Sequence, residues 1–203
     1  VRLSWSHGDQ EIFSQKELVD LFSLDAVGKS PAVFNPDKLL WLNAHYIKEA
    51  SPARLAEEMK PLWPAEARLG DAAFAQKVIA DLQPRVKTLV DLAKAAEFYF
   101  AGEIAYEAEA AQKFLTPDVS AHLQSIAAAI PGIEDFSKAG IEAFLKSFIE
   151  AKGIKFKAIA QPLRVALTGK TVSPGIDEVM VTLGKERVAK RITAAVDHIA
   201  KRQ

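Results

Sequence analysis

Residues 6–9, with the sequence Ser-His-Gly-Asp, place a hydroxyl, an imidazole and a carboxylate within four consecutive positions. A catalytic serine–histidine–aspartate triad is assembled by folding from separate parts of a chain, and it also needs an oxyanion hole. Four consecutive residues do not normally converge in that way. We therefore predict a turn here, followed by a helix that begins near Ser14, and no active site.

A second segment, Gly169-Lys170-Thr171, resembles the end of a phosphate-binding loop. That motif requires another glycine five residues earlier and a strand before it. Position 164 is an arginine, and the sequence before it is typical of a helix. We reject a nucleotide-binding loop at this place.

Candidate metal ligands are equally sparse. The chain has no cysteine, so it can form neither a disulfide nor a thiolate metal site. No two of its four histidines have the i, i+4 spacing of a helical metal site, and no carboxylate cluster accompanies them. We expect no metal, no cofactor and no catalytic residue in this chain, and interpret it as a binding or accessory module. The histidines, interpreted as surface or structural residues, are His7, His45, His122 and His198.

The charge of the chain is unevenly distributed. Its 203 residues have a formal net charge of zero. Residues 1–151 hold 15 Lys and Arg against 22 Asp and Glu, whereas residues 152–203 hold 11 against 4. A basic end of this kind can contact phosphates with one face, but it equally fits a solvated helix surface. We expect no DNA partner, because the chain as a whole is not basic.

The location of the protein is indicated by several features. No apolar run approaches the roughly 18–20 residues that span a bilayer, so we expect no membrane partner. The absence of cysteine fits a cytoplasmic protein. The chain begins with Val1-Arg2-Leu3 and has neither an initiator methionine nor a recognisable signal peptide. We interpret it as a piece of a longer polypeptide.

The periodicity of apolar residues predicts an all-α fold. Apolar side chains recur at three- and four-residue spacing, and no convincing alternation indicates a strand. Three tryptophans, Trp5, Trp41 and Trp63, are expected in the core. We predict about ten short helices, a bend at residues 61–64 (Pro-Leu-Trp-Pro), a break near Gly102, and packing of the segment from Lys152 against the preceding helices.

Helix boundaries have clear signals. Residues 14–17 (Ser-Gln-Lys-Glu) form a capping-box pattern. Four further helices are expected to begin where a capping side chain precedes a proline at the first helical position. These pairs are Asn35-Pro36, Ser51-Pro52, Thr116-Pro117 and Ser173-Pro174, and the predicted helix stops are Gly153, Gly169 and Gly184.

Five segments, in order, resemble the C-terminal region of bacterial glutamyl-tRNA synthetases. They are residues 5–13 (Trp-Ser-His-Gly-Asp-Gln-Glu-Ile-Phe), 30–43 (Ser-Pro-Ala-Val-Phe-Asn-Pro-Asp-Lys-Leu-Leu-Trp-Leu-Asn), 161–169 (Gln-Pro-Leu-Arg-Val-Ala-Leu-Thr-Gly), 173–176 (Ser-Pro-Gly-Ile) and 183–187 (Leu-Gly-Lys-Glu-Arg). The resemblance covers essentially the whole chain. It implies a helical-cage anticodon-binding region, with the end of the stem-contact region at 1–51 and two helical anticodon-binding subdomains at 52–100 and 101–203.

The resemblance also implies what this chain does. The family's catalytic domain, with its nucleotide fold and signature motifs, lies outside the chain, so we expect no aminoacylation by the fragment itself. The parent enzyme would attach glutamate to its tRNA through a glutamyl-adenylate, using ATP and magnesium. The expected partners are glutamate tRNA and the catalytic domain of the same polypeptide, and the expected oligomeric state is a monomer.

The family's base-recognising residues correspond to particular positions here. An arginine after a proline recognises the third anticodon base, cytosine, and the matching pair is Pro84-Arg85. A guanidinium can donate two hydrogen bonds to O2 and N3 of cytosine. Arginine at this position implies an enzyme that rejects the glutamine tRNA. Without the resemblance, Arg85 would be interpreted as a surface arginine at a helix start.

The other implied contacts lie in the basic segment. Arg164 and the segment of Ser173, Pro174, Gly175 and Ile176 correspond to the remaining base-recognising elements. Ser173 would cap a helix, Gly175 would let a base approach the backbone, and Ile176 would pack on a base face.

Phosphate contacts are expected from lysines and arginines outside these base-recognising elements. Lys38 matches a family lysine close to the tRNA backbone, and three further candidates follow from their place in the basic segment. These are Lys170, Lys185 and Arg187. The alternative function is a helical protein-interaction module without RNA binding.

Overall fold

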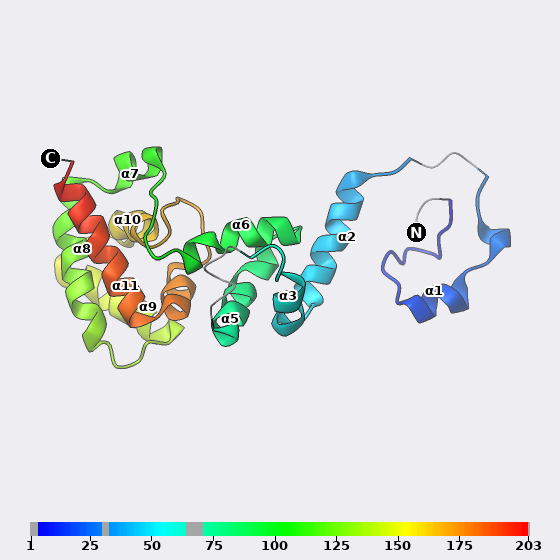
Figure 1. Cartoon of the computed structure of the whole chain (residues 1–203), viewed down its shortest axis with the longest axis horizontal. Coiled ribbons are helices and arrows are strands. Elements are labelled where there is room, and N and C mark those ends of the chain that lie inside the picture. The colour runs from blue at the N-terminus through cyan, green and yellow to red at the C-terminus, as the bar shows by residue number, and fades with distance from the viewer. Residues whose placement is uncertain (1–3, 30–32, 64–70, 203) are drawn as a thin grey trace.

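The structure, a computed structural model, describes residues 4–29, 33–63 and 71–202. Over these ranges the chain forms α-helices and short 3-10 helices, with an isolated β-bridge between His7 and Gln10 and no strand (Figure 1). The predicted all-α class is therefore confirmed for the described residues. Val1 to Leu3, residues 30–32 of the second motif and Pro64 of the predicted bend lie outside them.

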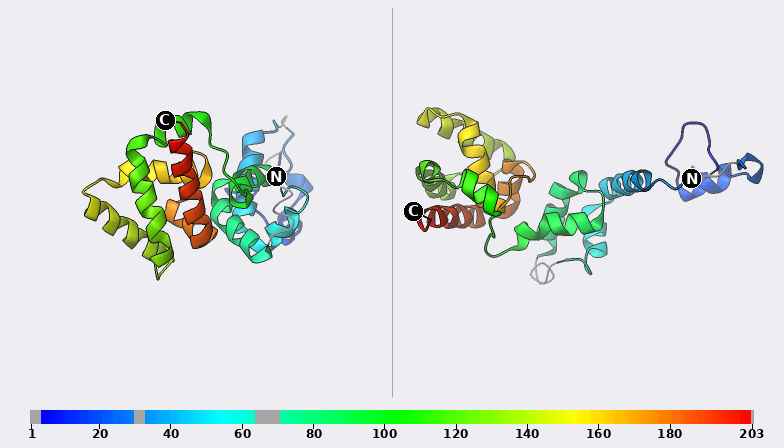
Figure 2. Two further views of the ribbon diagram at one scale, coloured as in Figure 1. Left: turned by 60° about the vertical axis from the view of Figure 1, so that its left-hand side comes forward. Right: turned by 90° about the horizontal axis from the view of Figure 1, so that it is seen from above.

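The helices follow one another along an elongated molecule, with α1 at one end and α7 to α11 at the other (Figures 1 and 2). They are α1 (Gln15–Leu21), α2 (Pro36–Glu49), α3 (Pro52–Glu58), α5 (Ala72–Leu82), α6 (Leu89–Phe100), α7 (Ala108–Phe114), α8 (Pro117–Ala129), α9 (Lys138–Lys152), α10 (Phe156–Thr168) and α11 (Ile176–Ala200). The 3-10 helices are η1 (Leu24–Ala26), η2 (Gln83–Arg85) and η3 (Ile130–Gly132). In the described ranges no helix is sufficiently long and apolar to span a bilayer.

The start of the chain folds as predicted. Gly8 has a positive φ of 51°, and the Gln10 amide donates to the His7 carbonyl oxygen at 3.2 Å, so residues 7–10 form a turn. Ser14 then caps α1, and the Ser14 amide donates to the Glu17 carboxylate at 2.7 Å, which completes the capping box. Trp5 is buried here, with its ring 5.6 Å from that of Phe13.

Two of the predicted proline starts are confirmed with their caps. The Asn35 side-chain oxygen accepts from the amides of Asp37 and Lys38, and the Ser51 hydroxyl accepts from the Arg54 amide. α8 also begins at the predicted proline, but the Thr116 side chain caps no backbone amide there.

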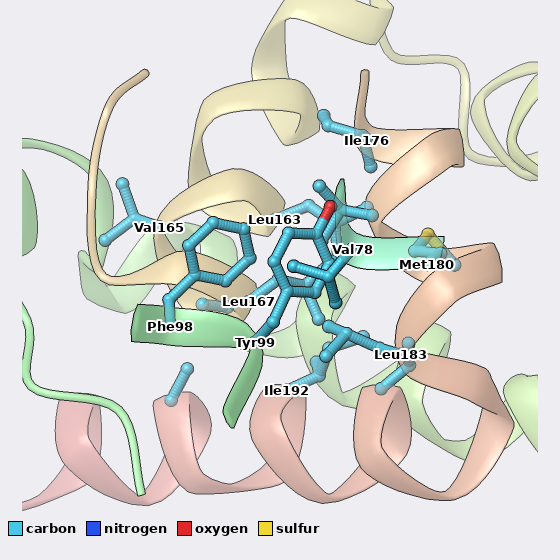
Figure 3. Close-up of a cluster of buried hydrophobic side chains, with 14 of the residues drawn as sticks. Val78, Phe98, Tyr99, Leu163, Val165, Leu167, Ile176, Met180, Leu183 and Ile192 are labelled. Carbon is cyan, nitrogen blue, oxygen red and sulfur yellow. The ribbon is translucent and has the colours of Figure 1, made fainter. Parts of the chain in front are cut away.

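The remaining helices share one core. α10 and α11 pack against α8 and α9, which confirms that the segment from Lys152 packs on the preceding helices. Side chains from α5, α6, α10 and α11 meet in this core (Figure 3). Among them Tyr99, Leu163, Leu167 and Met180 are completely buried. The predicted domain borders at 51/52 and 100/101 remain predictions.

Glycines end two helices as expected. Gly153 after α9 and Gly169 after α10 adopt the left-handed conformation, with φ of 63° and 76°. At Gly169 a Cβ atom would lie 2.3 Å from the Ala105 carbonyl oxygen, so no larger residue fits. Gly184, the third predicted stop, also ends a helical stretch: its φ of 76° and ψ of 160° are not helical, and a second helical stretch of α11 follows it.

The prediction that a helix begins at Ser173-Pro174 is wrong. α11 begins at Ile176, two residues later, with Gly175 as its N-cap. The Gly175 amide donates to the Glu178 carboxylate at 2.9 Å. The Ser173 side chain instead hydrogen-bonds to Arg164 and to the Pro174 carbonyl oxygen, and it therefore cannot act as a cap.

A buried arginine joins three helices. The Arg191 side chain in α11 donates to the carbonyl oxygens of Leu167 in α10 (2.8 Å) and of Phe98 and Ala101 at the end of α6 (2.7 and 2.9 Å). These carbonyls include groups that a helix end leaves without an intrahelical partner. Burial lowers the pKa of Arg191 to about 10, so the guanidinium stays charged at neutral pH.

Replacing Arg191 with alanine is expected to destabilise the fold by about 3 kcal/mol, because it strands buried carbonyl groups and leaves a void. Urea unfolding followed by circular dichroism measures the change. Arg202→Ala, at an exposed position on the chain's last turn, serves as the control and should change the free energy of unfolding little. Equal stability of the two variants would contradict the structural role of Arg191.

Candidate nucleic-acid interface

The end of α5 and the beginning of α11 bring two charged residues together across 93 positions of sequence. Arg85 ends η2, which directly continues α5, and its Nη2 atom lies 3.0 Å from Oε2 of Glu178. Gln83 anchors η2 by donating from its side chain to the Lys48 carbonyl oxygen of α2 at 3.0 Å. The Arg85 side chain is half exposed, so its guanidinium can contact a ligand while it is paired.

Arg164 in α10 fixes the segment that precedes α11. Its Nη1 atom donates to the carbonyl oxygens of Pro174 (2.8 Å) and Ser173 (3.1 Å) and to the Ser173 hydroxyl. Burial, followed by the nearby charge of Arg85, lowers the pKa of Arg164 from its usual value. Arg164 therefore positions the Ser173-Pro174 backbone, and any base contact would come from its Nη2 atom, because Nε is buried.

Side-chain oxygens of the next residues lie close to Gly175. A Cβ atom at this position would lie 2.6 Å from an Asp177 carboxylate oxygen and 3.2 Å from Oε2 of Glu178. The sequence had suggested that glycine here makes room for a base. The structure shows that the space beside Gly175 is occupied by the carboxylates of the first turn of α11.

The position of Ile176 corrects one expectation. Its side chain is only 6% exposed and belongs to the hydrophobic core, where Figure 3 shows it with Met180 of the same helix. It has little surface to offer the face of a base, because the first turn of α11 buries that side of the helix. The small exposed part of Ile176 contributes to a surface hollow.

This hollow lies between α9, α10 and the start of α11 and has a volume of about 420 Å³. That volume is within the usual range of small-ligand sites. Phe156, which is 45% exposed, offers an apolar surface at the hollow, whose charged lining consists of Lys146, Arg164, Glu142 and Asp177. An aromatic ring beside cationic side chains is a suitable surface for an unstacked base.

The expected phosphate contacts lie apart from this cluster. Lys38 in α2 pairs with Glu11, and its Nζ atom lies 4.4 Å from the centroid of the Trp41 ring. Trp41 itself is 45% exposed, so its predicted place in the core is wrong, whereas Trp5 and Trp63 are buried as predicted. α2 buries Ile47 and leaves Trp41 on its exposed side.

Of the three phosphate candidates in the basic segment, Lys170 follows α10, whereas Lys185 and Arg187 lie in α11 with their side chains near aromatic rings. Lys170 follows the end of α10, where its amide donates to the Thr168 hydroxyl at 3.2 Å. Lys185 and Arg187 follow the interruption of α11 at Gly184. Lys185 Nζ lies 5.8 Å from the ring centroid of Phe136, and the Arg187 guanidinium carbon 4.5 Å from that of Phe74. Their phosphate contacts remain predictions.

Two features of the site were missed in the sequence. Glu178 lies at the third helical position after Gly175, a spacing that signals a capping carboxylate but not its pairing with Arg85. Asp81 accepts hydrogen bonds from the hydroxyls of Tyr99 and Thr182, both at 2.7 Å, and so joins α5 to α6 and α11. Burial raises the pKa of Asp81, and these two hydrogen bonds act against the rise.

The fold and this interface define a class of protein: an all-helical binding domain that presents arginines around a short, hydrogen-bonded loop. The family model described as the anticodon binding domain matches residues 54–196. The chain therefore belongs to the anticodon-binding domain family.

Curated relatives and solved structures agree with this assignment. The chain is 56% identical over 203 residues to glutamate–tRNA ligase 1 of Syntrophus aciditrophicus, covering 98% of this chain and 42% of that protein. It is 49% identical over 200 residues to glutamate–tRNA ligase of Geobacter sulfurreducens, of which it covers 43%. A crystal structure of a glutamate tRNA ligase from Elizabethkingia meningosepticum, in complex with its amino acid, superposes with a TM-score of 0.88 at 27% identity, covering 98% of this chain and 39% of that one.

The predicted resemblance to bacterial glutamyl-tRNA synthetases is thereby confirmed. The chain spans less than half the length of the curated relatives that it matches.

Arg164→Ala is expected to release the segment that precedes α11, because the Ser173 and Pro174 carbonyls lose their donor. Hydrogen exchange of the peptide covering residues 171–176 should accelerate by about fivefold, the equivalent of one hydrogen bond. Lys157→Ala, an exposed change on the same helix, is the control and should leave that peptide unchanged. Unchanged exchange in Arg164→Ala would show that the segment is fixed by other contacts.

Proposed function

We propose that this chain binds the anticodon loop of glutamate tRNA and forms the RNA-recognising part of a larger glutamate–tRNA ligase. The observation that carries the proposal is the family match over residues 54–196 together with the placement of Arg85 beside the 173–178 segment. Relatives named glutamate–tRNA ligase over 98% of this chain support the choice of tRNA.

The chemistry of the site suits a single-stranded loop. Anticodon bases are unstacked and offer their pairing edges to side chains, whereas phosphate contacts only set the register. Nη2 of Arg85 is engaged with Glu178, and the remaining guanidinium donors suffice for the O2 and N3 acceptors of a cytosine. The hollow beside Phe156 and Arg164 offers a place for a second base.

We propose that the catalytic steps are carried out by a part of the ligase that this chain does not span. ATP, magnesium and glutamate would be bound by the part of the ligase that the chain does not span, and the chain would act as a monomeric recognition module in the cytoplasm. RNA binding without aminoacylation by the isolated chain is the behaviour that this division of labour requires.

Arg85→Gln is expected to weaken recognition of the third anticodon base. Loss of a two-donor contact to cytosine should cost about 1–3 kcal/mol of discrimination. The measurement is binding to a glutamate tRNA transcript and to a transcript with the third anticodon base changed from C to G. Arg54→Gln makes the same chemical change at an exposed arginine of α3 and should preserve the discrimination. Equal weakening on both transcripts would remove Arg85 from base recognition.

Lys38→Ala is expected to weaken binding to both transcripts alike and to reduce the slope of log affinity against log salt by about 1, as for one lost phosphate contact. Salt titrations measure the slope. Glu11→Gln is the matched control, because it removes the ion pair with Lys38 and keeps the lysine. A slope that Lys38→Ala leaves unchanged would exclude a phosphate contact.

A further inference from the structure

Glu178 connects the two parts of the candidate interface through a single carboxylate. Its Oε2 atom lies 3.0 Å from Nη2 of Arg85 and accepts from the Gly175 amide at 2.9 Å. Its Oε1 atom lies 3.4 Å from Nζ of Lys138 in α9. The carboxylate therefore contacts both the arginine at the end of η2 and the backbone that Arg164 holds in place.

The carboxylate is itself fixed by local structure. Glu178 occupies the first turn of α11, where backbone amides point toward it and the helix dipole favours a negative charge. The Gly175 hydrogen bond, followed by the Lys138 and Arg85 contacts, keeps the pKa of Glu178 below its usual value. Glu178 is thus charged at neutral pH and held at the helix start.

Arg85 needs such a partner. An arginine side chain that is half exposed samples many rotamers, and fixing it costs side-chain entropy. An exposed ion pair contributes little to stability, so this pair has small effect on folding. The ion pair instead restrains the orientation of the Arg85 guanidinium. Because Nη2 is bound to Glu178, the plane of the guanidinium is restrained before any ligand binds.

A second carboxylate extends this restraint to the elements that carry the two residues. Asp81, one helical turn before Arg85, accepts from the Thr182 hydroxyl, one turn after Glu178. The Asp81–Thr182 hydrogen bond therefore holds the end of α5 against the first turns of α11. The separation of Arg85 and Glu178 is set by these helices as well as by their own contact.

We propose that Glu178 is a positioning residue that sets the base specificity of Arg85. This inference rests on the proposed anticodon recognition. Glu178 acts through Arg85: it restrains the guanidinium so that its remaining donors meet the pairing edge of one base. Removing the charge of Glu178 should therefore reduce discrimination between bases and leave the phosphate contacts unchanged.

Glu178→Gln is the informative substitution. Glutamine keeps the length of the side chain and an oxygen that can accept from the Gly175 amide, but it loses the charge that pairs with Arg85. We expect the ratio of affinities for the cognate transcript and the third-base C→G transcript to fall by about threefold to tenfold. Affinity for the C→G transcript and the salt slope should not change.

The test is a double-mutant cycle on the 203-residue chain. The affinity ratio is measured for the unmodified chain, Glu178→Gln, Arg85→Gln and the double variant. If Glu178 acts through Arg85, then Glu178→Gln should change the ratio by less than about twofold in the Arg85→Gln background. Glu58→Gln, which makes the same chemical change at an exposed carboxylate that pairs with Arg54 in α3, is the control and should preserve the ratio.

The outcomes separate this inference from the function on which it rests. An unmodified chain that does not discriminate would overturn the proposed anticodon recognition. Discrimination that depends on Arg85 but persists in Glu178→Gln, or strictly additive effects of the two substitutions, would overturn the positioning role alone. Thermal unfolding checks the fold of each variant. If Glu178→Gln does not fold, Glu178→Asp provides the second test. Its shorter side chain moves the charge away from Arg85, so we expect the same loss of discrimination between the transcripts.

Discussion

The charge-assisted hydrogen bonds of the buried Arg191 are the constraint on which the rest of the structure depends. One guanidinium satisfies the ends of two helices, α6 and α10, and so fixes where α11 runs against them. The stretch of α11 before the interruption at Gly184 carries Glu178, and the Thr182–Asp81 hydrogen bond attaches that stretch to α5. Arg85 follows α5 directly. The position of Arg85, which we propose contacts a base, therefore depends on contacts between α5, α6, α10 and α11.

Local signals in the sequence predicted most of the fold. The caps at Ser14, Asn35 and Ser51 and the left-handed glycines at 153 and 169 depend on a few neighbouring residues, and each was confirmed. The physical reason is that a helix end is satisfied mainly by groups within one turn of it. Periodicity likewise identified the helices, because each needs one apolar face.

The predictions that proved wrong concern residues whose contacts come from distant parts of the sequence. Ser173 precedes a proline, as a helix cap often does, but its hydroxyl accepts a hydrogen bond from Arg164 of α10. At the start of α11 the Glu178 carboxylate instead accepts from the Gly175 amide. Trp41 was expected to be buried because tryptophan is a large apolar residue, but it is exposed. Its exposure depends on which face of α2 packs against the next helices. Arg85 and Arg164 were identified by resemblance, whereas Glu178 was missed because its pairing with Arg85 spans 93 positions.

The most direct test of the account is a salt titration of the unmodified chain binding to a glutamate tRNA transcript, compared with a transcript whose third anticodon base is changed from C to G. If Arg85 contacts a base, the cognate transcript should bind more tightly at every salt concentration, because the salt-dependent phosphate contacts are shared by both transcripts. Equal affinities that fall together with salt would contradict base recognition by this chain. Absence of binding to both transcripts at low salt would contradict the proposed function in RNA binding and would favour a protein-interaction module.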